Sequence, residues 1–254
     1  MALTFECASR TDTGRRADNE DSLLTSRRLL AVADGVGGSA AGEVASRWII
    51  EALNQLDKSR LTAELDVALA DAIAWGNQAI GFLAQCREHL AGMSTTLTAI
   101  ALDDGLYLIA NIGDSRAYRL RDARLTRLTR DDSFIQDLLD SGHLTPAQAR
   151  VHPARSLVLR ALDGDPARAP SLRRVGAREG DRLLVCSDGL SDVVDDAAIT
   201  TALRADDDPQ ACADALVDAA LERGSRDNVT VVVADVAARV DAEPLWPPAL
   251  MATG

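Results

Sequence analysis

Stretches with the patterns of strands and helices are grouped along this chain and do not alternate one by one. Short apolar strands fill the first 35 residues, and two helical stretches with apolar side chains at three-to-four spacing follow at 40–56 and 63–86. Strand patterns return between 94 and 129, near 156–159 and at 180–188; helical stretches at 195–204 and 209–224 and a last strand at 228–236 follow. Grouping of this kind favours an α+β domain with antiparallel sheets over a parallel α/β sheet.

The same pattern indicates one domain, which we place at residues 1–240. With 47% of its 254 residues hydrophobic, the chain has enough apolar side chains for one large core. Residues 133–153 contain a short helix and a Pro-containing segment that interrupt the strands, so we expect a flap there, over a site. Residues 241–254 are Pro-rich, and we expect a loosely ordered tail.

The net charge of −12 limits the partners of this chain. A strongly acidic protein repels nucleic acid and anionic membrane surfaces, so we expect neither as a partner. The four cysteines are widely separated without a Cys-x-x-Cys pair, which favours free thiols in a reducing compartment. The N-terminus lacks a basic region followed by an apolar run, and no uninterrupted apolar stretch reaches membrane-spanning length. These features predict a cytoplasmic protein.

Aspartates stand at the ends of the apolar strands. Asp34 and Asp188 each end a strand and precede a glycine, and further aspartates at strand ends are Asp21, Asp114 and Asp227. An Asp-Gly pair on its own is a common hairpin turn. Here, however, both pairs lead into helical stretches and not into return strands. The rigid end of a sheet could therefore aim these carboxylates at a common point.

Carboxylates that converge need protons or cations. Two unit charges 4 Å apart repel by about 4 kcal/mol at an effective dielectric constant of 20. Oxygen ligands without nearby His or Cys select Mg²⁺ or Mn²⁺ over zinc, and a glycine after an aspartate lets the backbone approach a metal closely. Gly35-Val36-Gly37-Gly38 is not followed by Lys-Ser/Thr, which argues against a nucleotide-binding loop.

Nine short blocks in chain order carry a family resemblance. They are GRRADNED from Gly14, ADGVGG from Ala33, GEVAS from Gly42, GMSTT from Gly92, IGDSRAY from Ile112, LTRD from Leu128, HPAR from His152, CSDGLSD from Cys186 and RDNVT from Arg226. In this order they resemble the metal-dependent protein phosphatases of type 2C, over about residues 5–236. The resemblance implies a four-layer α-β-β-α sandwich, in which two antiparallel sheets are flanked by helix pairs, with a metal centre in the cleft at the sheet ends.

The resemblance also implies roles for individual residues, with two to three Mn²⁺ or Mg²⁺ ions per chain. Asp34 would bridge two ions, the Gly35 carbonyl would bind one of them, and Asp188 and Asp227 would complete the other ion's shell. Asp114, together with Asp188, would bind a third ion. Glu20 and Asp21 would act through metal-bound water, and Arg16 would bind the substrate phosphate through its planar guanidinium group.

The implied reaction is direct hydrolysis of phosphoserine or phosphothreonine by a water bridging two metal ions. None of the cysteines starts a Cys-x5-Arg loop, so a phosphocysteine intermediate is not expected. The proton donor to the leaving group is not identified. Val36, Ser39 and Asp132 stand where relatives carry histidines, and the histidines of this chain are His143 and His152, both in the flap segment, and His89, which we expect on the surface.

The leading hypothesis is therefore a monomeric, metal-dependent protein serine/threonine phosphatase that opposes a bacterial Ser/Thr kinase. Its partners would be phosphorylated proteins, including that kinase and its substrates. Two alternatives are a non-catalytic phosphoprotein-binding module on the same fold and a metal-dependent hydrolase of small phosphate esters or diesters. A degenerate module would be expected to lose the metal carboxylates, whereas this chain retains them.

Overall fold

Two antiparallel sheets form the centre of the molecule. The computed structural model describes residues 3–36, 40–61, 63–239 and 245–246. The five-stranded sheet has the order β1–β11–β10–β7–β8, with bounds Leu3–Asp12, Val229–Ala238, Arg182–Cys186, Arg116–Arg121 and Arg124–Arg127. The six-stranded sheet has the order β2–β3–β5–β6–β9, with bounds Asp21–Thr25, Leu29–Val36, Leu97–Asp103, Leu106–Ile112 and Ser171–Gly176; β4 (Ser94–Thr95) pairs with β3.

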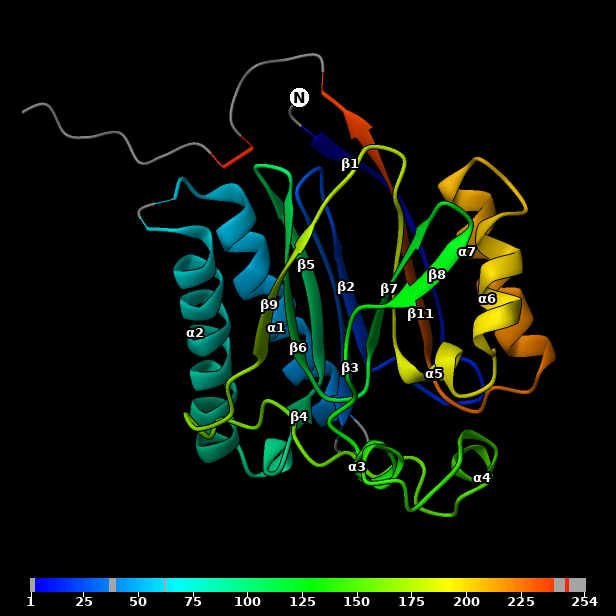
Figure 1. The fold of residues 1–254 in the computed structure, drawn as a ribbon. Helices are drawn as coiled ribbons and strands as arrows, with labels where there is room; N and C mark the ends of the chain where they lie inside the picture. Colours follow the sequence, from blue (N-terminus) through cyan, green and yellow to red (C-terminus); the bar gives the residue numbers. More distant parts are fainter. Residues whose placement is uncertain (1–2, 37–39, 62, 240–244, 247–254) are drawn as a thin grey trace, which may run out of the picture.

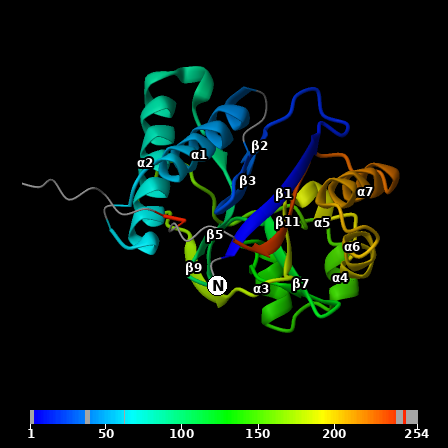
Figure 2. The ribbon, with the colours of Figure 1, turned by 90° about the horizontal axis from the view of Figure 1, so that it is seen from above.

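A helix pair covers the outer face of each sheet. The helices α1 (Ala40–Lys58) and α2 (Leu65–Cys86) pack on the six-stranded sheet, and α6 (Asp196–Leu203) and α7 (Pro209–Glu222) pack on the five-stranded sheet (Figures 1 and 2). The four-layer α-β-β-α arrangement expected from the sequence is confirmed. As expected, α7 begins at Asp208 and Pro209, and the Asp208 side chain accepts a hydrogen bond from the Gln210 N–H.

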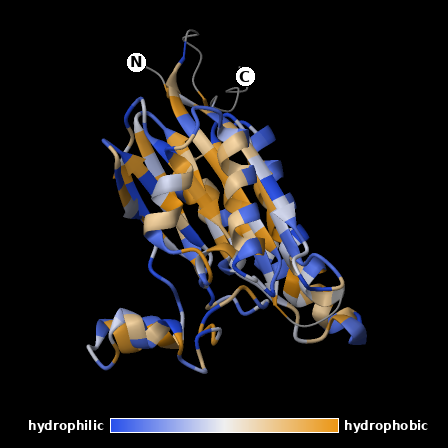
Figure 3. Cartoon of the chain, turned by 90° about the vertical axis from the view of Figure 1, so that its right-hand side faces the viewer, coloured by the Kyte–Doolittle hydropathy of each residue, from blue (hydrophilic) through white to orange (hydrophobic). Residues whose placement is uncertain are grey.

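The central strands are apolar on both faces because each lies between two packed layers. On β3, Leu29, Ala31 and Ala33 pack towards α1 and α2. The alternate residues Leu30 and Val32 point into the space between the sheets. β11 behaves in the same way, and the hydrophobic colouring is accordingly concentrated on the strands (Figure 3). Three stacked apolar layers thus hold the strand ends in fixed positions.

By length and composition, α2 is the one helix in the described part of the chain that could cross a membrane. Its Leu69, Ile73 and Ile80 are buried in the core layer shared with α1 and the six-stranded sheet. Packing against α1 and the six-stranded sheet therefore explains why α2 is so apolar. Its outward face carries the exposed Trp75 and Phe82.

The flap consists of two short helices at one end of the sandwich. The helices α3 (Phe134–Asp140) and α4 (Pro146–Arg150) lie beyond the strand ends, on the same side as the short helix α5 (Asp188–Ser191) (Figure 1). The α3 helix was expected, whereas α4 was not. Five residues are too few for a periodic signal, and α4 is defined by a capping box in which Thr145 and Gln148 exchange hydrogen bonds.

Two strand assignments and part of the tail differ from expectation. Residues 156–159 form only an isolated bridge, in which Val158 pairs with Ser133, and the strand is instead β9, which the sequence pattern missed. The prediction of a loosely ordered tail is wrong for Trp246, which is buried and donates a hydrogen bond from Nε1 to the Leu102 carbonyl at 2.8 Å. The Arg28 guanidinium lies 4.1 Å from the Trp246 ring centroid. The other tail residues, except Leu245, lie outside the described residues.

Candidate active site

The strand-end aspartates meet at one end of the sandwich, between the two sheets. Asp21 opens β2 and is the direct cross-strand partner of Asp34 on β3, in the six-stranded sheet. Asp188 follows β10 and Asp227 precedes β11, which are antiparallel neighbours in the five-stranded sheet. Asp114 lies in the turn from β6 to β7, where the chain passes from one sheet to the other. The convergence expected from strand-end positions is therefore what the topology produces.

Strand alternation aims Asp34 into the space between the sheets. It follows Leu30 and Val32 on the inward face of β3. Its backbone is fixed by a pair of threonines, because the Asp34 carbonyl accepts from Thr96 N at 2.9 Å and from Thr95 Oγ1 at 2.9 Å. The Asp34 N–H donates to Thr96 Oγ1 at 3.1 Å. The GMSTT block thus positions a carboxylate that lies about 60 residues earlier in the chain.

Two polar side chains from the five-stranded sheet tie the other acidic residues in place. Ser187 Oγ donates to Asp21 Oδ2 at 2.8 Å across the two sheets. The Asn228 side chain accepts from Glu20 N at 2.9 Å and donates to the carbonyls of Thr13 and Asp18 at 3.1 and 3.0 Å. Asn228 therefore holds the loop that carries Arg16 and Glu20 against the start of β11.

Burial and like charges raise the pKa values of these carboxyl groups. Burial, followed by the charges of Asp21 and Asp188, raises the pKa of Asp34 well above its usual range. The pKa of Asp188 is raised in the same way by burial and then by the charges of Asp114 and Asp192. Burial also raises the pKa of Asp114 to about 7 and that of Asp21 to about 6. Without cations, these groups would hold protons near neutral pH.

Buried oxygens without partners indicate that the cluster fits a divalent cation. Asp21 Oδ1 and Asp188 Oδ1 are buried and accept no hydrogen bond in the described structure. An unpaired buried carboxylate oxygen is costly, and a hard cation such as Mg²⁺ or Mn²⁺ would remove that cost. Among the described residues, no group of three or more His, Cys, Asp or Glu side chains is placed to hold a metal ion on its own. Any ion at this cluster would therefore also need backbone and water oxygens as ligands.

Gly35 is required by close packing of the backbone. A Cβ at this position would lie 2.3 Å from the Gly42 carbonyl oxygen and 2.7 Å from the Glu20 carbonyl oxygen. The sequence prediction explained this glycine by close approach of a metal. The structure adds another reason, because the glycine lets β3, the Glu20 loop and the first turn of α1 touch.

Arg16 is paired with one of the aspartates. Its Nη2 donates to Asp227 Oδ2 at 2.8 Å, and 55% of the Arg16 side chain is exposed to solvent. This pair holds the guanidinium at the mouth of the cluster. Donors that are not used for Asp227 remain available for an oxyanion.

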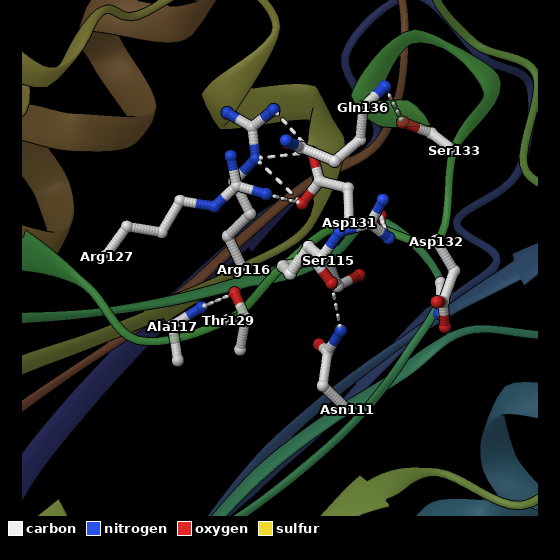
Figure 4. Close-up of polar contacts among 12 residues, drawn as sticks. Asn111, Ser115, Arg116, Ala117, Arg127, Thr129, Asp131, Asp132, Ser133 and Gln136 are labelled. Carbon is white, nitrogen blue, oxygen red and sulfur yellow. Dashed lines mark hydrogen bonds and ion pairs between the residues drawn. The ribbon is translucent and has the colours of Figure 1, made fainter. Parts of the chain in front are cut away.

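A charge cluster fixes the turn that carries Asp114 to the base of the flap (Figure 4). Arg116 binds the buried Asp131 carboxylate with Nε at 3.0 Å and Nη2 at 2.7 Å, and Arg127 pairs with the other oxygen. The next residue, Asp132, donates from its N–H to the Gly113 carbonyl at 2.8 Å. The start of the flap is therefore tied by direct contacts to the turn that carries Asp114.

The positions considered for a proton donor lie in different surroundings. Asp132 accepts from Gly113 N at 3.2 Å and pairs with Arg160, so it is committed to the flap base. His152 Nδ1 accepts from Ala154 N at 3.1 Å and shapes its turn, as expected. Val36 and His89 are exposed. His143 Nδ1 lies 2.6 Å from Ser141 Oγ. Ser39 lies outside the described residues.

Comparison with known families decides the classification. The model of the family described as protein phosphatase 2C matches residues 14–222 of this chain. The chain belongs to the protein phosphatase 2C family. The matched range contains Arg16 and four of the five strand-end aspartates, and Asp227 follows five residues after its end.

Individual members of the phosphatase 2C family are similar over almost the whole chain. The serine/threonine protein phosphatase PstP of Mycobacterium tuberculosis is 48% identical over 93% of this chain, which spans only 46% of that relative. The serine/threonine phosphatase stp of Listeria innocua is 34% identical, with 89% of this chain and 94% of the relative covered. A solved structure of the PstP catalytic domain in complex with two manganese ions has a TM-score of 0.87 at 46% identity, covering 93% of this chain and all of that chain. This chain therefore spans about half the length of the first relative.

Asp192 belongs to this phosphatase 2C site, although sequence analysis gave it no role. Its N–H donates to the Asp188 carbonyl at 2.8 Å across α5, and its charge contributes to the raised pKa of Asp188. The spacing Asp188-x-x-x-Asp192, one helical turn, was the available signal. Ser187 and Asn228 were also missed, because their role is to orient other residues.

Proposed function

We propose that this chain is a metal-dependent protein serine/threonine phosphatase. The observation that carries the proposal is the meeting of five strand-end carboxylates between the sheets, two of them with buried oxygens lacking a partner. Membership of the phosphatase 2C family supports the same reaction class. The similarity to a PstP catalytic domain solved with two manganese ions supports Mn²⁺ as a cofactor.

We assign the metal-holding role to Asp34, the Gly35 carbonyl, Asp188 and Asp227, with Asp114 for a third ion. Mn²⁺ or Mg²⁺ at these oxygens would supply Lewis-acid activation of water and neutralise phosphate charge. Glu20 and Asp21 would orient water around the ions. Ser187 supports this role, because it holds one oxygen of Asp21 and leaves the other directed into the cluster.

Arg16 is the proposed phosphate-binding residue. Asp227 holds one of its donors, and the planar guanidinium can present further N–H groups to two oxygens of one phosphate. The Asn228 hydrogen bonds fix the loop in which Arg16 lies. This loop would therefore bind and orient the phosphate monoester at the mouth of the carboxylate cluster.

The biological setting is also a proposal. The substrates would be phosphoserine or phosphothreonine proteins, including a bacterial Ser/Thr kinase that this enzyme opposes. All four cysteines are free thiols, and one of them, Cys86, is exposed to solvent. Free thiols support a reducing, cytoplasmic location. A monomeric state is supported by the coverage of both sheets by helices of the same chain.

The test is release of inorganic phosphate from a phosphothreonine peptide. We expect turnover with Mn²⁺ or Mg²⁺, loss of turnover with a chelator, and loss with Asp188→Asn. Asp71→Asn, an exposed aspartate on α2, is the matched control. Stoichiometric peptide binding without turnover in saturating Mn²⁺ would instead identify a binding module. Comparable or faster turnover of sugar phosphates would identify a small-ester hydrolase.

A further inference from the structure

Arginines gather around the carboxylate cluster, although the chain as a whole is acidic. A pocket of about 620 Å³ lies between the flap, α5 and the start of β11. Its lining includes the arginines Arg150, Arg155 and Arg226 and the aspartates Asp188, Asp192 and Asp227. Three arginines thus balance three aspartates here, whereas the whole chain has a net charge of −12.

These arginines have weak ties to the rest of the protein. Arg150 has one long ion pair, 3.8 Å from Asp195, and its side chain is 67% exposed. Arg155 and Arg226 make no side-chain hydrogen bond or ion pair with any residue that the structure describes, although the charge of Arg155 does influence Asp192. By contrast, Arg116 and Arg127 are both bound to Asp131. The guanidinium groups at the pocket are therefore available to an external anion.

The arginines stand on several sides of the carboxylates. Arg150 comes from the flap, Arg155 from the segment that follows the flap, and Arg226 from the loop before β11. On the N-terminal loop, Arg15 Nη2 lies 4.0 Å from the position that a Cβ at Gly224 would take, and Gly224 lines the same pocket. Arg150 and Arg155 also line an adjoining pocket of about 400 Å³ under the flap. We call Arg15, Arg150, Arg155 and Arg226 the arginine rim.

The rim is placed to bind groups on either side of a phosphorylated residue. The scissile phosphate would lie at the carboxylate cluster with Arg16, so its position is accounted for without the rim. A substrate chain that enters this cleft would lie near Arg150, Arg155 and Arg226, which line the same pocket. Neutral or basic neighbours would leave those guanidinium groups without partners, whereas carboxylates or a second phosphate would pair with them.

We propose that the arginine rim selects substrates with further anionic side chains close to the phosphorylated residue, either acidic residues or a second phosphorylated residue. This inference rests on the proposed phosphatase function and specifies its substrate class. The net charge of −12 repels anionic substrates at a distance. The net charge acts over long range and is screened by salt, while the rim acts within the cleft.

The experiment compares peptides within each protein variant. Four phosphothreonine peptides differ only in the residues that flank the phosphothreonine: alanines, glutamates, lysines or a second phosphoserine. Their kcat/KM values are measured with Mn²⁺ for the wild type and for the double variant Arg155→Gln, Arg226→Gln. Arg204→Gln, an exposed arginine just after α6, is the charge-matched control. Because the readout is a ratio between peptides in one variant, a change in general activity cancels.

For the wild type we expect the glutamate-flanked and doubly phosphorylated peptides to exceed the alanine peptide about tenfold, since exposed ion pairs contribute modestly and add up. The preference should fall to about twofold in the double variant, stay unchanged in Arg204→Gln, and shrink at high salt. A wild-type enzyme that treats all four peptides alike would overturn the inference, as would a preference retained by the double variant.

Failure of the proposed function gives a different result. In that case no peptide releases phosphate with Mn²⁺, and the inference is judged by fluorescence anisotropy with the same peptides carrying a dye. Tighter binding of the glutamate-flanked peptide than of the alanine peptide, lost in the double variant, supports the rim. Equal affinities for the two peptides contradict it.

Discussion

The two ends of strand β10 carry two aspartates in opposite surroundings. Asp181, just before the strand, is fully buried and accepts hydrogen bonds from Tyr107 Oη at 2.6 Å, Arg121 Nη2 at 2.6 Å and Arg178 N at 3.0 Å. Asp188, just after it, has a buried oxygen without a hydrogen-bond donor in the described structure. Burial raises the pKa of both groups, but the Arg121 and Tyr107 hydrogen bonds outweigh it at Asp181, whose pKa is lowered.

The difference separates the roles of the two ends of the sandwich. At the Asp181 end, the buried carboxylate is compensated by partners inside the protein, so Asp181 contributes to stability. At the Asp188 end, compensation inside the protein is incomplete, and under the proposed function a cation and a substrate anion would complete it. A site that binds a charged ligand needs charged groups that protein partners have not already neutralised. The following predictions test this comparison, with the largest expected effect first.

Asp188→Asn should reduce kcat for a phosphothreonine peptide about a thousandfold, roughly 4 kcal/mol, because preorganised charge at the reacting phosphate is lost. The same variant should unfold in chelator at a temperature no lower than the wild type, since Asn replaces a buried carboxyl group whose charged form is disfavoured by burial and by neighbouring aspartates. Steady-state kinetics with Mn²⁺ and thermal unfolding in chelator provide the two measurements. A marked loss of stability without metal would contradict the assignment of Asp188 to function.

Asp181→Asn should lower the free energy of unfolding by about 3 kcal/mol, because Arg121 and Tyr107 lose a charged partner in a buried site. Activity per folded molecule should stay within about twofold of the wild type, since the site lies at the other end of the strand. Urea unfolding and kinetics at a temperature where the variant is folded test this. A large loss of activity in the folded variant would contradict the conclusion that Asp181 contributes to stability and not to activity.

Stability without metal should depend on pH in a defined direction. The folded protein binds protons at Asp21 and Asp114, whose pKa values are about 6 and about 7, whereas the unfolded chain has already released them. The free energy of unfolding in chelator should therefore fall by about 4 kcal/mol between about pH 5 and pH 8. With saturating Mn²⁺ the fall should be smaller or absent, because the cations replace the protons. Unfolding curves that do not depend on pH in chelator would exclude the raised pKa values.

Arg16→Lys should reduce kcat/KM about tenfold, since the charge remains but the planar pair of donors is lost. Inhibition by inorganic phosphate should weaken by a similar factor, which separates phosphate binding from a defect in metal loading. Arg204→Lys serves as the control. An unchanged inhibition constant for phosphate would remove Arg16 from the phosphate site.

The sequence predicted the fold where strands are buried on both faces. The runs Leu29–Ala33 and Val231–Ala234 are apolar without interruption, and both belong to central strands. β9 was missed because it is the edge strand of its sheet, and four of the residues in Ser171–Gly176, including two arginines, stand exposed in a row. An exposed edge strand has little alternation to detect.

The positions of the site residues were predictable, but their contacts were not. Strand ends identified each aspartate, and the family resemblance supplied the roles. The hydrogen bond from Ser187 to Asp21 joins residues 166 positions apart, and no local spacing encodes such a pairing. The surroundings of Asp192 and of the rim arginines depend on how segments distant in the sequence come to line the same pockets.

The base of the flap is closed by contacts between its own two ends. Asp132 accepts a backbone hydrogen bond from Leu159 N at 2.8 Å and pairs with Arg160, while Ser133 bridges to Val158. Because this closure is local, the length and sequence between the ends can change at little cost to the sandwich. The segment between these ends, which carries Arg150 and Arg155 of the proposed rim, therefore resembles an exchangeable cassette that can diverge while the carboxylate end of the sandwich stays constant. Evolution could retarget such an enzyme without rebuilding its chemistry.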